Sequence, residues 1–174
     1  MKLDDDDFTL FGLPQVHRLN REALDTRWRQ LQGEVHPDRF AAEGASAQRI
    51  AMQWAVRVNE AYQRLKDPLR RAAYLCELRG AVIDAERNTA MPQHFLMQQM
   101  QWREALDDAA DLAAVRLLAD ELSQHQKQML ADVQRRLDDE NDAAAAAQDV
   151  RALMFLQRFR QDIARRLDAL DPHR

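Results

Sequence analysis

Residues 36–40 read His-Pro-Asp-Arg-Phe, and they follow directly on LDTRWRQLQGEV (residues 24–35), an amphipathic stretch with helical spacing. Proline has no amide hydrogen to donate and pushes the residue before it out of the α region, so Pro37 predicts that the helix ends at or just before His36. A simple helix end more often uses glycine or asparagine. The imidazole and carboxylate on either side of Pro37 therefore indicate a more specific purpose for this turn.

Apolar residues on both sides of this motif recur at helical spacing. The earlier helix is expected to begin after an N-cap at Asn20, and its apolar stripe is Leu24, Trp28, Leu31 and Val35. The later helix follows the polar loop FAAEGASAQ, and its stripe is Ile50, Trp54, Val58, Ala61, Tyr62 and Leu65. Two such helices joined by a short loop pack as an antiparallel hairpin. The sequence thus predicts that HPDRF is exposed at the tip of a hairpin.

A third helix is expected to start at Asp67-Pro68, with the aspartate as N-cap and the proline at the first helical position, and to end at Gly80. The acidic run Asp4–Asp7 is expected to be a disordered stub. These segments make up a predicted N-terminal helical domain, residues 1–80.

The second half of the chain is predicted to be a separate helical domain. Residues 81–90, AVIDAERNTA, show no periodicity and are predicted to be a linker. Three helical segments follow, at about residues 92–110, 112–139 and 143–170, and their short connections favour up-and-down neighbours. Residues 91–174 are therefore predicted to form a three-helix bundle, which makes the whole chain all-α.

Composition limits the class of protein further. Of 174 residues, 46% are hydrophobic and 31% are charged, with only 4 glycines and 5 prolines, which favours an all-helical soluble protein. Apolar runs are far shorter than the roughly 20 residues of a membrane span, and no signal-peptide segment follows Met1. We therefore expect a cytoplasmic protein that does not enter a membrane. The single Cys76, among apolar neighbours, is expected to be a buried thiol.

Three other kinds of site are not expected. A metal site is not expected, because the remaining histidines show no i, i+4 spacing to one another or to Cys76. These histidines are His17, His94, His125 and His173. No serine or glycine-rich constellation supplies the nucleophile and oxyanion site that a catalytic His–Asp pair would need.

Residues 1–80 carry 13 basic and 12 acidic side chains, four of the acids lying in Asp4–Asp7, so the folded part is basic and an acidic partner is indicated. A nucleic acid is not expected, because the arginines are not interleaved with exposed aromatics. The remaining interpretation of HPDRF is a recognition motif on a rigid turn.

The first helix of the predicted bundle has more apolar residues than one face can hold. Its core stripe is Phe95, Trp102, Leu106 and Ala109. Three further apolar residues lie about 100–200° round from Phe95, with Glu104 among them, and they are Leu96, Met97 and Met100. In the last helix, Phe155 lies at the edge of the core stripe, which is Leu156, Phe159, Ile163, Leu167 and Leu170. These residues either form an exposed patch for a protein partner, which methionine suits, or are covered by another helix.

Several motifs together resemble a known family. DDFTLFGLP, HPDRF between two helices, VNEAYQRLKDP and LRRAAYLCELRG resemble the J-domain of DnaJ-type co-chaperones. NTAMPQHFLMQQMQWREALDDA and VRALMFLQRF resemble the C-terminal part of HscB, a co-chaperone of iron–sulfur cluster assembly. The two resemblances span nearly the whole chain.

The resemblance implies two binding sites. In J-domains the His-Pro-Asp motif engages a DnaK-type chaperone ATPase and stimulates ATP hydrolysis, which implies this role for His36, Pro37 and Asp38. Basic residues near the motif meet an acidic surface of the ATPase, and the matching residues here are Arg27, Arg29 and Arg39. In HscB proteins the bundle holds the scaffold protein IscU, and the matching residues are Leu96, Met97, Met100, Gln101, Glu104 and Phe155. The resemblance thus favours the exposed patch.

The expected function is that of an adaptor without catalytic activity, cofactor or metal of its own. It would stimulate the ATPase of an HscA/DnaK-type chaperone and deliver the IscU-type scaffold to it. Two alternatives remain, a J-domain co-chaperone for a different client and a helical adaptor in which HPD is incidental. The chain departs from the common pattern at Glu34 and Val35, where many J-domains have a basic and an aromatic residue, and at Gln101, where a glutamate is expected.

Overall fold

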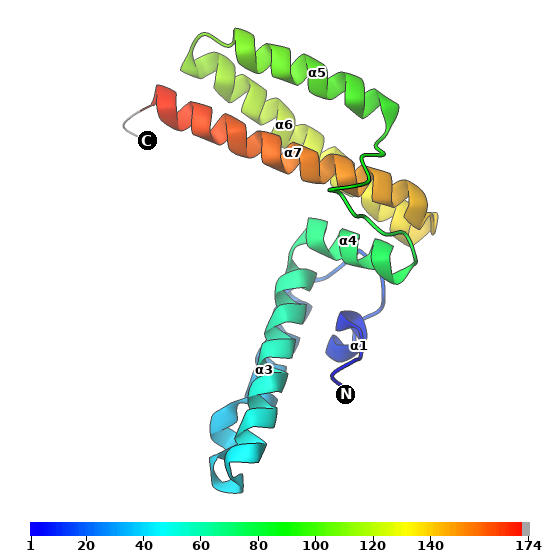
Figure 1. The fold of residues 1–174 in the computed structure, drawn as a ribbon, viewed down its shortest axis with the longest axis vertical. Helices are drawn as coiled ribbons and strands as arrows, with labels where there is room; N and C mark the ends of the chain where they lie inside the picture. The colour runs from blue at the N-terminus through cyan, green and yellow to red at the C-terminus, as the bar shows by residue number, and fades with distance from the viewer. Residues whose placement is uncertain (172–174) are drawn as a thin grey trace. The chain divides into compact units, whose positions relative to one another are not determined.

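The computed structural model describes residues 1–171, so His173 and the end of the predicted bundle lie outside the described residues. The described chain is helical throughout its regular structure and contains no strand within that range, which confirms the predicted all-α fold (Figure 1). It divides into two compact units, Met1–Leu75 and the described residues from Cys76 onward. This division falls inside a helix, a few residues before the boundary that the sequence predicts.

The first unit is built on an antiparallel hairpin. Its elements are α1 (Asp7–Phe11), α2 (Arg21–Val35), the 3₁₀ helix η1 (Pro37–Glu43), α3 (Ala45–Lys66) and the start of α4 (Pro68–Leu78). Arg21 at the start of α2 lies within hydrogen-bond distance of Tyr62 near the end of α3. At the other end Val35 and Ala51 line the same hollow, so the two helices run in opposite directions.

The expected caps of α2 and α4 are present. The side chain of Asn20 accepts from the amide of Ala23 at 3.1 Å, and that of Asp67 accepts from the amides of Leu69 and Arg70 at 2.9 and 3.1 Å. Each cap satisfies amides that the first turn of a helix cannot pair internally. The helix starts inferred from these residues are therefore confirmed.

The hairpin loop is more ordered than the sequence suggests. η1 continues to Glu43 and α3 begins at Ala45, because Gly44, with φ of 97°, makes the sharp change of direction between them. The prediction that Ile50 lies in the buried stripe of α3 is wrong, since its side chain is 54% exposed. The first turns of α3 lie beyond the end of α2, where the apolar face borders an open hollow rather than a packed helix.

The acidic run near the N-terminus is not a disordered stub. Asp6 caps α1 by accepting from the amide of Thr9 at 3.1 Å. Asp7 is fully buried, and its two carboxylate oxygens lie 2.8 Å from Arg57 and 3.0 Å from Arg64. The prediction was wrong here because the two arginines follow Asp7 by 50 and 57 residues, which no local pattern reveals.

Replacing Asp7 by Ala is expected to lower the free energy of unfolding by about 2–4 kcal/mol, since it leaves two partly buried arginines without a counter-charge. Asp4→Ala, at an exposed position of the same run, is the control and should change it by less than about 0.5 kcal/mol. Native-state hydrogen exchange of α1 and α3 amides measures both. Equal effects of the two substitutions would contradict the structural role of Asp7.

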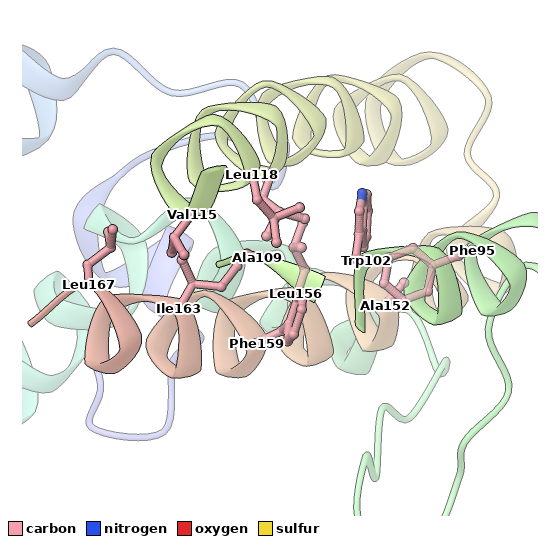
Figure 2. Packing of buried hydrophobic residues seen from close by; sticks show 11 residues of the cluster. Phe95, Trp102, Ala109, Val115, Leu118, Ala152, Leu156, Phe159, Ile163 and Leu167 are labelled. Atoms are coloured by element: carbon pink, nitrogen blue, oxygen red, sulfur yellow. The ribbon is translucent and has the colours of Figure 1, made fainter. Parts of the chain in front are cut away.

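The second unit contains the predicted three-helix bundle. Its long helices are α5 (Gln93–Asp108), α6 (Leu112–Gln134) and α7 (Ala143–Leu170), and a short π-helical segment, η2 (Arg135–Asp139), ends α6. α6 and α7 lie side by side, and the shorter α5 runs along part of them (Figure 1). Figure 2 shows the buried residues that gather between them, namely Phe95, Trp102, Ala109, Val115, Leu118, Leu122, Ala152, Leu156, Phe159, Ile163 and Leu167. The core stripes predicted for α5 and α7 are therefore buried, although Leu106 and Leu170 are only partly covered.

The segment of residues 81–90 is held against the bundle by one side chain. Arg151 of α7 is 6% exposed and donates to the carbonyl oxygens of Val82, Ile83 and Ala90 at 3.0, 2.8 and 3.1 Å. Ile83 is itself buried. The segment lacks helical periodicity, as the sequence predicts for a linker. Its contacts with Arg151 and the burial of Ile83 nevertheless make it an ordered part of the second unit.

The thiol of Cys76 is fully buried, as its apolar neighbours predict. Burial raises the pKa of this thiol to about 11, because the thiolate would lose its hydration, while the charges of Arg79 and Arg151 oppose the shift. Cys76 therefore remains a neutral, packed side chain across the physiological range.

Because its pKa is raised on folding, Cys76 contributes stability that is fully present below the unfolded-state pKa and is lost as the pH rises through about 11. The stability advantage of the wild type over Cys76→Ala is therefore expected to shrink by about 2–3 kcal/mol between about pH 8 and pH 11.5. Denaturant unfolding of both proteins at the two pH values measures this. Subtracting the unfolding free energy of Cys76→Ala from that of the wild type removes the contribution of other titrating groups. A difference that is the same at both pH values would show that burial does not disfavour the thiolate of Cys76.

Candidate functional site

The HPD turn begins where α2 ends. Val35 is the last residue of α2, and His36 follows with φ −61° and ψ 127°, an extended conformation of the kind required before proline. Pro37 then occupies the first position of η1. The predicted end of the helix at Pro37 is confirmed, and the turn leaves His36 and Asp38 on the surface with side-chain exposures of 56% and 90%.

The turn orients the imidazole of His36. The amide of Asp38 donates to Nδ1 of His36 at 3.3 Å, and the carboxylate of Asp38 lies 3.6 Å from the same nitrogen. Because Nδ1 acts as the acceptor, the neutral ring carries its proton on Nε2. The turn thus displays an N–H donor on His36 and a carboxylate acceptor on Asp38, with the backbone of Pro37 between them.

Arg39 has a structural contact as well as a place beside the motif. Its Nη1 donates to the carbonyl oxygen of Gly33 at 2.9 Å, one of the last-turn carbonyls that α2 cannot pair internally. The guanidinium therefore ties η1 back to the helix that precedes it. Arg39 positions the HPD turn, and the rest of its guanidinium is exposed at the same end of the hairpin.

The two other arginines do not share one face of α2. At about 100° per residue, Arg27 and Arg29 lie about 200° apart around the helix. Arg27 is half-buried beside the hollow that Gly12 and Leu13 line, whereas Arg29 is exposed. The structure therefore does not bring Arg27 and Arg29 together on a single flat surface.

Away from the HPD turn, toward the start of α2, polar and aromatic contacts join α2 to α3. The rings of Trp28 and Tyr62 stack with centroids 4.5 Å apart, and the indole of Trp28 donates to Asn59 at 3.0 Å. The hydroxyl of Tyr62 donates to Asp25 at 2.7 Å, and this hydrogen bond together with that from Arg21 holds the pKa of Asp25 below its usual value. Asn59 and Tyr62 belong to the NEAY sequence, whose role in this chain is to align the two helices of the hairpin.

An apolar hollow lies beside the HPD turn, between the end of α2, η1 and the start of α3. It has a volume of about 440 Å³, and Phe40, Ile50 and Trp54 are among its lining residues. Glu34 and Val35, where the chain departs from the common pattern, also line it. Val35 is only 6% exposed, so it serves the packing of the hairpin rather than its surface.

The bundle exposes an apolar face of α5. Leu96, Met97 and Met100 are 39%, 63% and 68% exposed, so no part of the described chain covers them. Met97, Met100, Gln101 and Glu104 recur at i, i+3, i+4 and i+7, which places them on one face, and the last two are also exposed. We call Leu96, Met97, Met100, Gln101 and Glu104 the α5 surface.

Phe155 lies at the edge of the α5 surface rather than on it. Its half-buried ring meets the buried ring of Phe95 edge to face, with centroids 6.1 Å apart. The guanidinium of Arg103 lies 5.5 Å from the centroid of Phe155 and 5.6 Å from that of Phe159. Arg103 is on the same side of α5 as Leu96, seven residues before it, and so it connects the α5 surface to the aromatic edge of α7. Arg103 is not among the residues predicted from the sequence, although its i+7 spacing from Leu96 was an available signal.

Neither a metal site nor a membrane span is found in the part of the chain that the structure describes. Residues 1–171 contain no group of three or more His, Cys, Asp or Glu side chains that could hold a metal ion. None of the helices in that range is long and apolar enough to cross a membrane.

Comparison with known proteins identifies the family. The sequence profile of the HSCB C-terminal oligomerisation domain matches residues 91–164. The "Co-chaperone protein HscB homolog" of Bordetella petrii is 50% identical over 161 residues, which are 92% of this chain and 95% of that protein. The chain belongs to the HscB family of co-chaperones. As a co-chaperone, this HscB-family protein has a chaperone as its partner.

Solved structures of the HscB family have the same fold. Chaperone HscB from Vibrio cholerae is 38% identical, with a TM-score of 0.86, over 95% of this chain and 99% of that one. Human co-chaperone HscB is 25% identical, also with a TM-score of 0.86, over 95% of this chain and 84% of that one. The similarity therefore extends over both units of the chain.

Proposed function

We propose that this protein stimulates ATP hydrolysis by an HscA/DnaK-type chaperone and delivers an IscU-type scaffold to it during iron–sulfur cluster assembly in the cytoplasm. The observation that carries the proposal is the HPD turn, an exposed His36 and Asp38 at the tip of a helical hairpin in a chain of the HscB family. The protein itself performs no covalent chemistry and holds no cofactor, and hydrolysis takes place in the partner.

The HPD turn binds the ATPase through a small number of oriented polar groups. The Nε2–H of His36 donates to an acceptor on the ATPase, and the carboxylate of Asp38 accepts from a donor there. Little conformational entropy is lost on binding, because Pro37 and the Arg39–Gly33 hydrogen bond already hold the turn. The exposed Arg29 and Arg39 steer the encounter with an acidic surface, and Arg27 contributes less because it is half-buried.

The α5 surface, together with Phe155, binds the scaffold. Exposed methionine and leucine side chains can adapt to an apolar partner surface, and their coverage removes them from water. Gln101 and Glu104 form a polar rim on the same face. A chain that binds the scaffold at one unit and the ATPase at the other raises the local concentration of each near its partner, so neither contact has to be tight.

His36→Gln is expected to reduce stimulation of the chaperone ATPase by about 30-fold, the effect of removing an interaction worth about 2 kcal/mol. The measurement is single-turnover ATP hydrolysis by the cognate HscA-type chaperone without scaffold. The control is His94→Gln, an exposed histidine on α5, which should stimulate as the wild type does. Full stimulation by His36→Gln would refute the assignment of the HPD turn.

Leu96→Ala combined with Phe155→Ala is expected to weaken binding of the cognate IscU-type scaffold by about 100-fold, since both remove apolar area from the contact. Isothermal titration calorimetry measures the affinity, and circular dichroism shows that the bundle remains folded. Leu117→Ala on α6, where the leucine is 71% exposed, is the matched control and should bind as the wild type does.

The same experiment separates the proposal from its nearest alternative. A wild-type protein that stimulates the ATPase but does not bind the scaffold would be a J-domain co-chaperone for a different client. A double variant that binds the scaffold as well as the wild type would place the scaffold site elsewhere on the chain.

A further inference from the structure

Arg103 of α5 lies over aromatic rings of α7. Its guanidinium lies over two aromatic rings, 5.5 Å from the centroid of Phe155 and 5.6 Å from that of Phe159. Attraction between the cation and the negative faces of the rings holds the side chain in place. The planar guanidinium has five N–H donors in a rigid fork, and a position over rings leaves those donors available to an acceptor.

No acceptor or counter-ion for Arg103 is found within residues 1–171. Asp107, one turn further along α5, is at the spacing where an ion pair could form, but the two side chains are not within ion-pair distance. Some other arginines of the second unit have carboxylate partners, such as Arg136 with Asp149 and Arg165 with Asp162. Arg103 is thus an oriented cation whose opposite charge is not supplied by the described chain.

The surroundings of Arg103 would strengthen an ion pair made there. Leu96 and Met100 lie two turns and one turn before it along α5, and both are exposed. A partner that covers these apolar groups also removes water from the guanidinium, and an ion pair that is shielded from water is stronger than one on an open surface. The apolar contact and the charge contact would therefore form together.

We propose that Arg103 binds a carboxylate of the scaffold protein and sets the register of the scaffold on α5. This inference rests on the proposed function, and it adds both a residue and the chemistry of its partner, an Asp or Glu side chain next to apolar residues that cover Leu96 and Met100. The guanidinium fork fits the two oxygens of that carboxylate.

The charges near Arg103 give the contact its selectivity. Glu104, Asp107 and Asp108 are all exposed on the same helix, so an acidic group of the scaffold is repelled along this part of α5 except at Arg103. An arrangement in which one position attracts and its neighbours repel favours a single register over shifted ones. A neutral or basic partner residue would instead gain nothing at Arg103.

The test uses the full-length protein and the cognate IscU-type scaffold, with affinities measured by isothermal titration calorimetry at low and high salt. Arg103→Met, which keeps the cover over the rings but removes the charge, should weaken binding about tenfold and reduce its salt dependence. Arg103→Lys, which keeps the charge without the fork, should be weakened about threefold. Lys127→Met removes an exposed charge from α6 and should have no effect.

A charge exchange identifies the partner residue. Arg103→Glu should weaken binding by about 100-fold, and one Asp→Lys or Glu→Lys variant of the scaffold should restore it, while the same scaffold variant binds the wild type poorly. Restoration cannot come from a change in the stability of the bundle, so it supports the ion pair even if Arg103→Met alters packing.

Two results would overturn the inference in distinguishable ways. If Arg103→Met binds the scaffold within about twofold of the wild-type affinity, the role of Arg103 is refuted and the proposed function stays intact. The same holds if no scaffold variant restores binding to Arg103→Glu. No binding of scaffold by the wild type would refute the proposed function, and the inference with it.

Discussion

Pro37, which has no amide hydrogen and whose ring crowds the residue before it, is the constraint on which the first unit depends. It ends α2 at Val35 and keeps His36 extended, so that the chain reverses into η1 and α3 can return alongside α2. The same reversal brings the guanidinium of Arg39 to the carbonyl of Gly33 and the amide of Asp38 to the ring of His36. The residue that ends the helix therefore also determines which nitrogen of the imidazole faces solvent.

The two surfaces proposed to bind partners differ in the physical means of recognition that they offer. The HPD turn is polar, small and already ordered, so it contributes orientation with little buried area. The α5 surface consists of flexible apolar side chains that can adapt to a partner. Arg103 joins these properties, since its charge is directional while the rings below it belong to the apolar packing of the bundle.

The parts that could be predicted from the sequence depend on local spacing. The caps at Asn20 and Asp67 and the core stripes of α5 and α7 follow from periodicity and from side-chain chemistry within a few residues. The end of α2 at Pro37 follows from steric exclusion. The sequence shows that α5 has more apolar residues than one helix face can hold. Only the packed structure shows that no other helix covers the additional ones.

The parts that could not be predicted depend on contacts between distant residues. The burial of Asp7 requires Arg57 and Arg64 on α3, and an acidic run by itself is indistinguishable from a solvated tail. Ile50 continues the stripe of α3, but the partner helix ends too early to cover it. The position of Arg103 depends on two rings of α7, which lie on a helix far along the chain.

The contacts of Arg151 place a limit on how this part of the chain can change in evolution. An unattached connection accepts insertions and deletions along its whole length. Here Val82 and Ile83 at one end and Ala90 at the other must reach the same guanidinium, so both ends have a fixed distance to α7. Changes in length can be absorbed only by the exposed turn between them, where Asp84 already adopts a positive φ of 39°. A relative with a longer or shorter connection should therefore differ within residues 84–89 and retain the arginine.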